Sequence, residues 1–148
     1  MEESAEMKKE SIKVSLCSLP TEGVGDILSR KRSEGSLPIY PKVAIVCLID
    51  EMKKMGYSCD NYDFYDIDML YPSDDEIRNY FTSYKPDVVG LSAVISTSYS
   101  QVKRIAGIIR KELPNTWIVM GGNLSANAEA VLKSTEVDLC VHGDGEIA

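Results

Sequence analysis

The sequence predicts an α/β protein built on a five-stranded parallel sheet. A short apolar, β-branched run at residues 87–91 lies between turn signals and is typical of a strand buried on both faces. Similar short runs alternate along the chain with longer segments of helical periodicity. This alternation indicates parallel strands joined by helices that cover both faces of the sheet.

Composition limits the classes of function. The chain has 148 residues, enough for one domain with a hydrophobic core, and a formal charge of −7. An acidic chain of this kind is a poor candidate for nucleic-acid binding, which favours a basic face. No apolar run of about 18 residues predicts a membrane span, and residues 1–10 form a charged tail without an apolar signal core. We therefore expect a cytoplasmic protein with a disordered tail at residues 1–10, followed by one domain at 11–148.

The four cysteines lie far apart and form no CxxC pair. Without a secretory context, we expect them to be buried thiols and to have no disulfide or metal role. They are Cys17, Cys47, Cys59 and Cys140.

The first half of the chain predicts a strand at residues 11–18 and a long loop rich in Gly and Pro at 19–40. Residues 41–55 predict a helix that is buried on most sides, although their apolar run at 43–49 leaves a strand as an alternative. A second strand is expected at residues 57–66.

The middle of the chain has clear helix signals. Ser73 and Glu76 form a capping box, and the residues after them place an apolar stripe on one helix face. That stripe consists of Ile77, Tyr80, Phe81 and Tyr84. After the central strand at 87–91, a second helix is expected at residues 99–113. Its core-facing residues are Val102, Ile105, Ala106, Ile109 and Leu113.

The last elements are a strand at residues 116–120, a short helix at 126–133 and a strand at 137–141. In that helix, Ala128, Val131 and Leu132 are expected to point inward. Right-handed crossovers favour a flavodoxin-like or Rossmann-like three-layer sandwich with strand order 2-1-3-4-5. A further helix is expected after the fifth strand, so we interpret the chain as the front part of a longer protein.

Ligands of open α/β sheets bind at the carboxyl ends of the strands. Here those ends are small and uncharged after the third, fourth and fifth strands, a combination typical of a cofactor-binding surface. The candidate residues are Ser92, Ser96, Thr97, Ser98, Gly121, Gly122, Asn123, Gly143 and Gly145. Helix capping and tight turns are the alternative roles for these residues. We interpret Asp66 as a solvated strand end or a helix cap, and His142 as a surface residue.

Several other sites are excluded. The segment after the first strand contains Gly23 and Gly25 but lacks the third glycine of a dinucleotide-binding GxGxxG. No P-loop occurs, and the acidic and Lys residues of a phospho-receiver domain are missing at the strand ends. The sequence also has no cluster of His, Cys or carboxylates at metal-ligand spacing. A self-contained catalytic centre is therefore not predicted.

Three stretches in the order KPDVVGLSAVIST, TWIVMGGNLSAN and VDLCVHGDGE resemble the cobalamin-binding domain at the front of cobalamin-dependent radical S-adenosylmethionine (radical SAM) enzymes. The resemblance covers about residues 12–146 and implies that cobalamin is the cofactor. GLSAVIS also resembles the Ser-x-Leu segment of cobalamin-dependent methionine synthase. That match implies that Ser92, Val94 and either Ser96 or Thr97 line a pocket for the nucleotide tail, which Gly121 and Gly122 let pass.

One feature departs from methionine synthase and the mutases. Their D-x-H-x-x-G motif after the first strand supplies a histidine to cobalt, whereas this chain has Gly25 at the corresponding place. The resemblance therefore implies a radical SAM enzyme, often a methyltransferase, whose 4Fe-4S cluster and S-adenosylmethionine bind in a downstream domain. This fragment alone is expected to be non-catalytic. The alternatives are a free-standing corrinoid carrier and a flavodoxin-like module that binds a flavin or a nucleotide.

Overall fold

The computed structural model describes residues 12–21, 42–94, 96–145 and 147. The tail predicted at residues 1–10 and most of the loop predicted at 19–40 lie outside the described residues. Within the part of the chain that is described, no helix combines the length and apolar character needed to cross a membrane.

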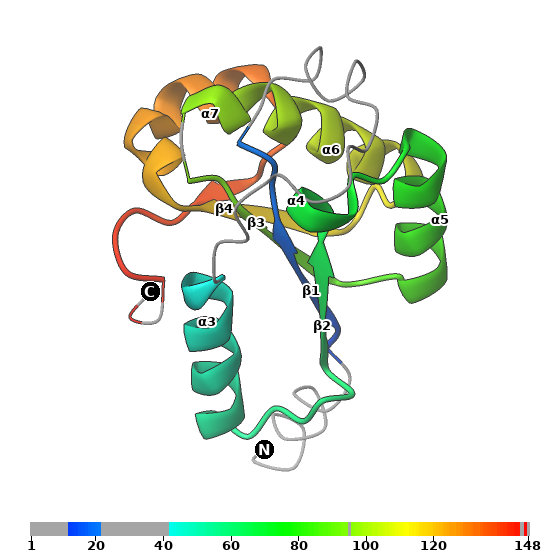
Figure 1. The fold of residues 1–148 in the computed structure, drawn as a ribbon, viewed down its shortest axis with the longest axis vertical. Helices are drawn as coiled ribbons and strands as arrows, with labels where there is room; N and C mark the ends of the chain where they lie inside the picture. Colours follow the sequence, from blue (N-terminus) through cyan, green and yellow to red (C-terminus); the bar gives the residue numbers. More distant parts are fainter. Residues whose placement is uncertain (1–11, 22–41, 95, 146, 148) are drawn as a thin grey trace.

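The sheet confirms the predicted topology. Its five strands are all parallel and follow the order β2-β1-β3-β4-β5. Figure 1 shows β1 and β3 in the middle of the molecule with helices on both sides of the sheet. The strands are β1 Val14–Ser18, β2 Tyr62–Asp66, β3 Val88–Ser92, β4 Trp117–Gly121 and β5 Leu139–Cys140.

Strands β1, β2 and β5 are shorter than predicted, and β1 begins at Val14. Strand β2 begins at Tyr62 because a turn occupies the preceding residues, in which the Asn61 side chain accepts from the Ser58 amide at 2.9 Å. Strand β5 has only two residues. Just before β5, the Asp138 carboxylate accepts a hydrogen bond from the Ile118 amide of β4 at 2.8 Å. In a longer strand, that amide would donate to a main-chain carbonyl instead.

Three helices cover one face of the sheet, which we call the core face (Figure 1). They are α5 Asp74–Tyr84, α6 Tyr99–Glu112 and α7 Ala128–Ser134. Ser73 and Glu76 form the predicted capping box at the start of α5. On this face, the residues of the three inner strands β1, β3 and β4 are 0–1% exposed and pack against the apolar stripes of the helices. They include Cys17, Val89, Leu91, Ile118 and Met120.

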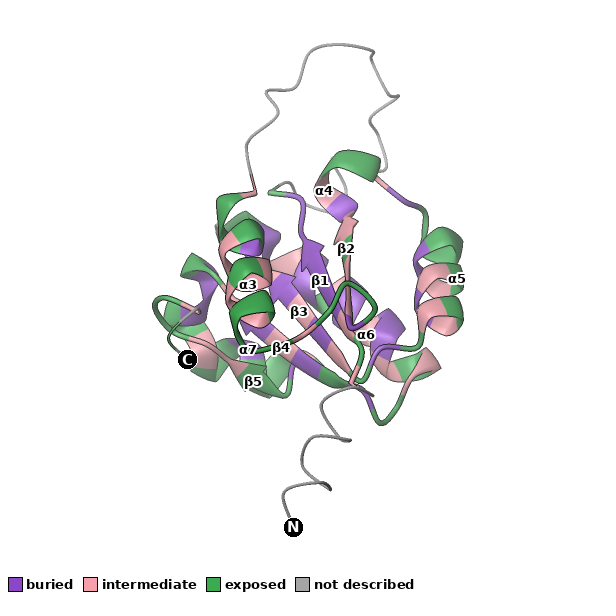
Figure 2. Cartoon of the chain, turned by 90° about the horizontal axis from the view of Figure 1, so that it is seen from below, coloured by how far each residue is buried: buried purple, intermediate pink, exposed green. Residues whose placement is uncertain are grey.

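The opposite face, the α3 face, is covered differently. Among the described residues, α3 (Val43–Lys54) is the one helix on this face (Figure 1), and Figure 2 shows the strands visible beside it. Only Ile45 of α3 is buried, whereas Val43 and Val46 are exposed. The prediction of a helix buried on most sides is therefore wrong, because α3 contacts the sheet along one stripe and no other helix of the described part of the chain covers its outer side.

Three smaller predictions also need correction. Leu132 is exposed rather than buried, because α7 begins at Ala128 and turns only Val131 fully into the core. Residues 126 and 127, the start of the predicted helix, belong instead to the tighter helix η2 Asn123–Asn127. All four cysteines are free thiols, as expected, but only Cys17 is buried, and Cys59 is exposed.

Candidate functional site

The last residues of four neighbouring strands form one row, which we call the carboxyl edge. The register pairs Ser18 of β1 with Asp66 of β2 and with Ser92 of β3, and pairs Ser92 with Gly121 of β4. All four side chains are small or polar, and the row lies where an open α/β sheet binds its ligand. Ser92 and Gly121 therefore lie side by side, as the predicted strand order requires.

The loops that leave β3 and β4 are bound to each other through the main chain. The Ala93 amide donates to the Gly121 carbonyl at 2.9 Å, and the Leu124 amide donates to the Ala93 carbonyl at 3.2 Å. Residues of both loops stand at the carboxyl edge, and Val94, Ser96, Thr97, Gly122 and Asn123 are exposed there. The structure thus brings together predicted site residues from the loops after β3 and β4, which are Ser92, Val94, Ser96, Thr97, Gly121, Gly122 and Asn123. Gly143 follows β5 at the same edge.

Gly122 has a structural reason to be glycine. Its φ is +93°, and a Cβ built on it would lie 2.4 Å from the Ala93 carbonyl oxygen. The tight-turn alternative therefore accounts for this residue without a ligand. Gly121 differs, because a Cβ built there meets no atom within 4 Å. Open space for a ligand thus lies at Gly121 and not on the packed side of Gly122.

The Thr97 and Ser98 hydroxyl groups, which follow β3, differ in their hydrogen bonding. The Thr97 hydroxyl donates to the Thr21 carbonyl, so the loop after β3 contacts the loop after β1. Ser98, which lies in helix η1 (Ser96–Ser98), is fully buried, and its hydroxyl has no hydrogen-bond partner among the described residues. Since it also makes no capping bond to α6, helix capping does not account for the Ser98 side chain.

The β2 side of the carboxyl edge is polar and tightly connected. The Ser18 hydroxyl donates to Asp66 Oδ1 at 2.5 Å. The same carboxylate oxygen accepts the Met69 amide at 3.2 Å and caps the short helix α4 (Ile67–Leu70), so the interpretation of Asp66 as a helix cap is confirmed. Sequence reasoning missed Ser18 as part of this edge, although its place at the end of a strand beside Ser92 was the available signal.

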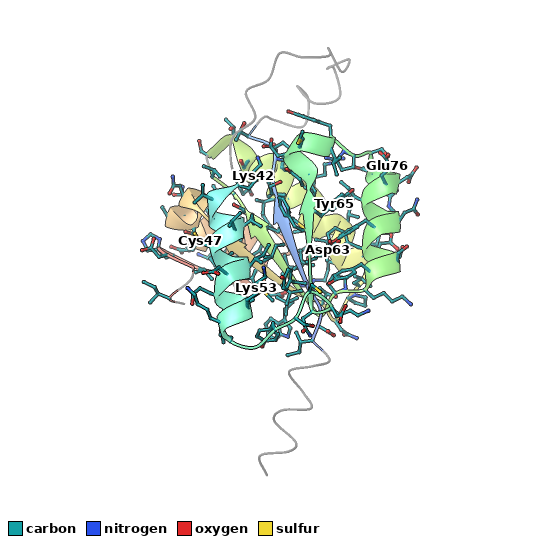
Figure 3. All side chains as sticks on the ribbon, turned by 60° about the horizontal axis from the view of Figure 1, so that its bottom comes forward. Lys42, Cys47, Lys53, Asp63, Tyr65 and Glu76 are labelled. Atoms are coloured by element: carbon teal, nitrogen blue, oxygen red, sulfur yellow. The ribbon has the colours of Figure 1, made fainter. Side chains whose placement is uncertain are left out.

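An ion pair joins the start of α3 to α4. The Lys42 ammonium binds the Asp68 carboxylate, and both side chains are about three-quarters buried. Figure 3 shows Lys42 at one end of α3, with Cys47 and Lys53 following along the helix. This pair holds the end of the lone helix next to the carboxyl edge.

Ionisable groups beneath the carboxyl edge are kept neutral. Burial raises the pKa of the Cys17 thiol to about 12. Burial and the 2.9 Å hydrogen bond to Asp63 raise the pKa of Tyr80, whereas its bond with Ser15 lowers it. Among the described residues, no three His, Cys, Asp or Glu side chains are grouped to hold a metal ion. The carboxyl ends of β3 and β4 can therefore offer small surfaces and hydroxyl groups to a large uncharged ligand.

A parallel α/β domain whose carboxyl edge is small and uncharged at β3 and β4 is typical of cofactor-binding domains. The family model described as the B12 binding domain matches residues 37–148. This chain belongs to the B12 binding domain family. No curated protein matches it.

The fold is also similar to a crystal structure of a novel cobalamin-binding protein from Desulfitobacterium hafniense DCB-2, with a TM-score of 0.54 at 14% sequence identity. The superposition covers 90% of this chain and 53% of that protein. The chain thus spans about half the length of that protein, and at this identity the likeness shows a shared fold.

Proposed function

We propose that this domain holds cobalamin at the carboxyl edge, with the nucleotide tail of the cofactor entering between the ends of β3 and β4. The family match and the name of the structural neighbour support the cofactor. The open space at Gly121, beside Ser92, is the observation that supports this place on the fold. The proposed contacts are Ser92, Val94, Ser96, Thr97, Gly121, Gly122, Asn123 and Gly143.

The residues present fit such a group. Gly90, Ser92 and Gly121 share the α3 face by the strand register and alternation, so small side chains follow one another toward the carboxyl edge. A Cβ on Gly90 would lie 3.0 Å from Leu16 Cδ2, which leaves little room there, whereas Gly121 is open. The flat base of the tail would therefore contact the Gly121 end of this row. Bound cobalamin supplies a cobalt centre that can carry a methyl group, and the chain's own part is to bind and orient the cofactor.

The single histidine of the sequence, His142, is exposed after β5. The segment after β1 contains no histidine. We expect bound cobalamin to have no imidazole from that segment below the cobalt and to show a base-off absorbance spectrum. Mixing the protein with hydroxocobalamin and desalting tests this directly. A retained flavin spectrum, or no retained chromophore, would contradict the proposal.

A matched pair of variants tests the place of binding. Gly121→Leu fills the open space at the carboxyl edge and is expected to abolish retention of cobalamin. Gly107→Leu adds the same side chain in α6, where a Cβ also meets no atom within 4 Å, and should leave retention unchanged. Circular dichroism of both variants checks that they fold. Equal retention by the two variants would place the cofactor elsewhere.

We further infer that the domain works beside a downstream radical SAM domain, which would hold a 4Fe-4S cluster and S-adenosylmethionine. The three stretches in their order around β3, β4 and β5 support this inference, as does the absence of the D-x-H-x-x-G motif. The reading frame beyond residue 148 tests it. A CxxxCxxC motif there would agree with the proposal, whereas a frame without one would favour a free-standing corrinoid protein.

A further inference from the structure

The row of strand ends at the carboxyl edge carries a carboxylate at one end only. It begins at Asp66 on the edge strand β2 and passes through Ser18 and Ser92 to Gly121. Cys17 lies in the core, so strand alternation places Ser18 and its partners in the row on the α3 face. Adjacent strands are about 4.8 Å apart, which puts Asp66 about 14 Å from Gly121. The carboxylate is therefore placed to meet a different part of a large ligand than Gly121 does.

One carboxylate oxygen of Asp66 is available to a ligand. Oδ1 accepts the Ser18 hydroxyl at 2.5 Å and the Met69 amide at 3.2 Å. Oδ2 has no hydrogen-bond partner among the described residues, whereas the nearby Asp68 carboxylate is paired with Lys42. Asp66 is partly exposed, so a molecule on the carboxyl edge can reach it. Because Oδ1 is held from two sides, Oδ2 is an acceptor in a fixed place.

A carboxylate at this place discriminates between the parts of a cobalamin molecule. The nucleotide tail contains a phosphodiester, whose negative charge Asp66 would repel. The corrin ring is surrounded by carboxamide groups, whose N–H groups donate to a carboxylate oxygen in a charge-assisted hydrogen bond. The β2 end of the row therefore favours the ring, and the uncharged β3 and β4 ends favour the tail.

We propose that Asp66 Oδ2 accepts a hydrogen bond from a carboxamide of the corrin ring and thereby fixes the orientation of the cofactor on the carboxyl edge. Ser18 is a positioning residue, since its hydroxyl holds the carboxylate from the neighbouring strand. The inference rests on the proposed function and adds a specificity to it. A corrinoid that carries a carboxylate in place of that one carboxamide should bind poorly.

Cobalamin monocarboxylic acids, in which one ring carboxamide at a time is hydrolysed, test this contact. Absorbance titration of the full chain gives the dissociation constant of each acid and of hydroxocobalamin. One acid is expected to bind at least about tenfold more weakly than hydroxocobalamin, because its carboxylate meets Asp66 and a charge-assisted hydrogen bond is lost. In Asp66→Asn this penalty should shrink severalfold, because asparagine is neutral and its amide can donate to the carboxylate.

The variant and its control are chosen to keep the fold. Asparagine caps helices about as well as aspartate, and its side-chain oxygen can still accept from Ser18 and Met69. Asp60→Asn is the matched control, since Asp60 is exposed in the turn before β2, at the opposite end of that strand. It should leave the ratio of the two dissociation constants unchanged. Circular dichroism checks that both variants fold.

The outcomes distinguish this inference from the proposed function. Suppose that hydroxocobalamin binds and Gly121→Leu abolishes binding, but Asp66→Asn leaves the ratio for every acid unchanged. The cofactor then lies at the carboxyl edge, and the contact with Asp66 is wrong. Equal relief of the penalty by Asp60→Asn would also overturn the contact, because the effect would come from overall charge. If the unmodified chain binds no hydroxocobalamin, the proposed function and this inference both fail.

Discussion

The two faces of the sheet are built from the same strands but are covered to very different extents. On the core face, Val89 and Ile118 are 0% exposed beneath α5, α6 and α7. On the α3 face, the neighbouring residue Trp117 is 60% exposed, and α3 buries only Ile45. Figure 2 shows this contrast from the side of α3. One residue along β4 thus separates the best-packed part of the domain from its most open part.

This difference indicates a division of roles. Burial of apolar side chains stabilises a fold roughly in proportion to the area removed from water, so most of the stability must come from the core face. The α3 face contributes less to stability, and it carries the small residues that lead to the carboxyl edge. Substitutions should therefore affect stability on one face and binding on the other.

The largest expected effect comes from the core face. Ile118→Ala should lower the free energy of unfolding by about 3 kcal/mol, because it removes a fully buried side chain and leaves a cavity. Leu139→Ala, on the α3 face, should lower it by less than about 1 kcal/mol. Urea unfolding followed by circular dichroism measures both. Equal losses would mean that the two faces contribute equally to stability.

A smaller effect is expected where the loops of β3 and β4 meet. Gly122→Ala should cost about 2 kcal/mol, because a side chain is strained at φ +93° and would collide with the Ala93 carbonyl. Gly121→Ala, one residue earlier, should change the free energy of unfolding by less than about 0.5 kcal/mol. The same urea measurement applies. If neither variant changed the free energy of unfolding, the result would contradict the close approach of the Ala93 carbonyl to Gly122.

A third effect is absent at neutral pH and should appear only at alkaline pH. The unfolded chain loses the Cys17 proton near pH 9, whereas the native chain keeps it until about pH 12. Between these values the native state binds more protons, so the free energy of unfolding should fall as pH rises, by up to about 1.4 kcal/mol per pH unit.

Variants isolate the contribution of this thiol. Cys17→Ala should remove its part of the alkaline slope, and the remaining part reflects other groups whose pKa burial raises, among them Tyr80, Tyr65 and Cys140. Cys59→Ala, at an exposed thiol, should leave the slope unchanged. An identical slope in Cys17→Ala and the unmodified protein would show that the buried thiol does not titrate in this range.

Most of the fold was predictable because the core face gives strong local signals. The capping box at Ser73 and the stripe that ends at Tyr84 fix α5, and the buried run of β3 fixes the centre of the sheet. Helix α3 was harder, because an apolar run looks buried in sequence whatever covers it. Val43 and Val46 are exposed since no helix within the described ranges lies over them, and a single sequence does not contain that information.

The candidate site was predictable in place but not in detail. Parallel strands must end at one edge, so the nearness of Ser92 and Gly121 followed from the topology alone. The role of Gly122 did not follow, because its conformation depends on how closely Ala93 approaches from another loop. Likewise, the two hydrogen bonds of Asp66 depend on the short helix α4, which has no sequence signal beyond its cap.

The main-chain bonds between the two loops have a consequence for how such a domain diversifies. Ala93 bonds to both Gly121 and Leu124 through its peptide groups, so the backbone there is held without help from outward side chains. Val94 and Asn123 stand on that fixed frame and are exposed. These two residues can therefore be replaced by others in evolution. Such replacements would change the contacts to a bound molecule and leave the backbone of the two loops in place.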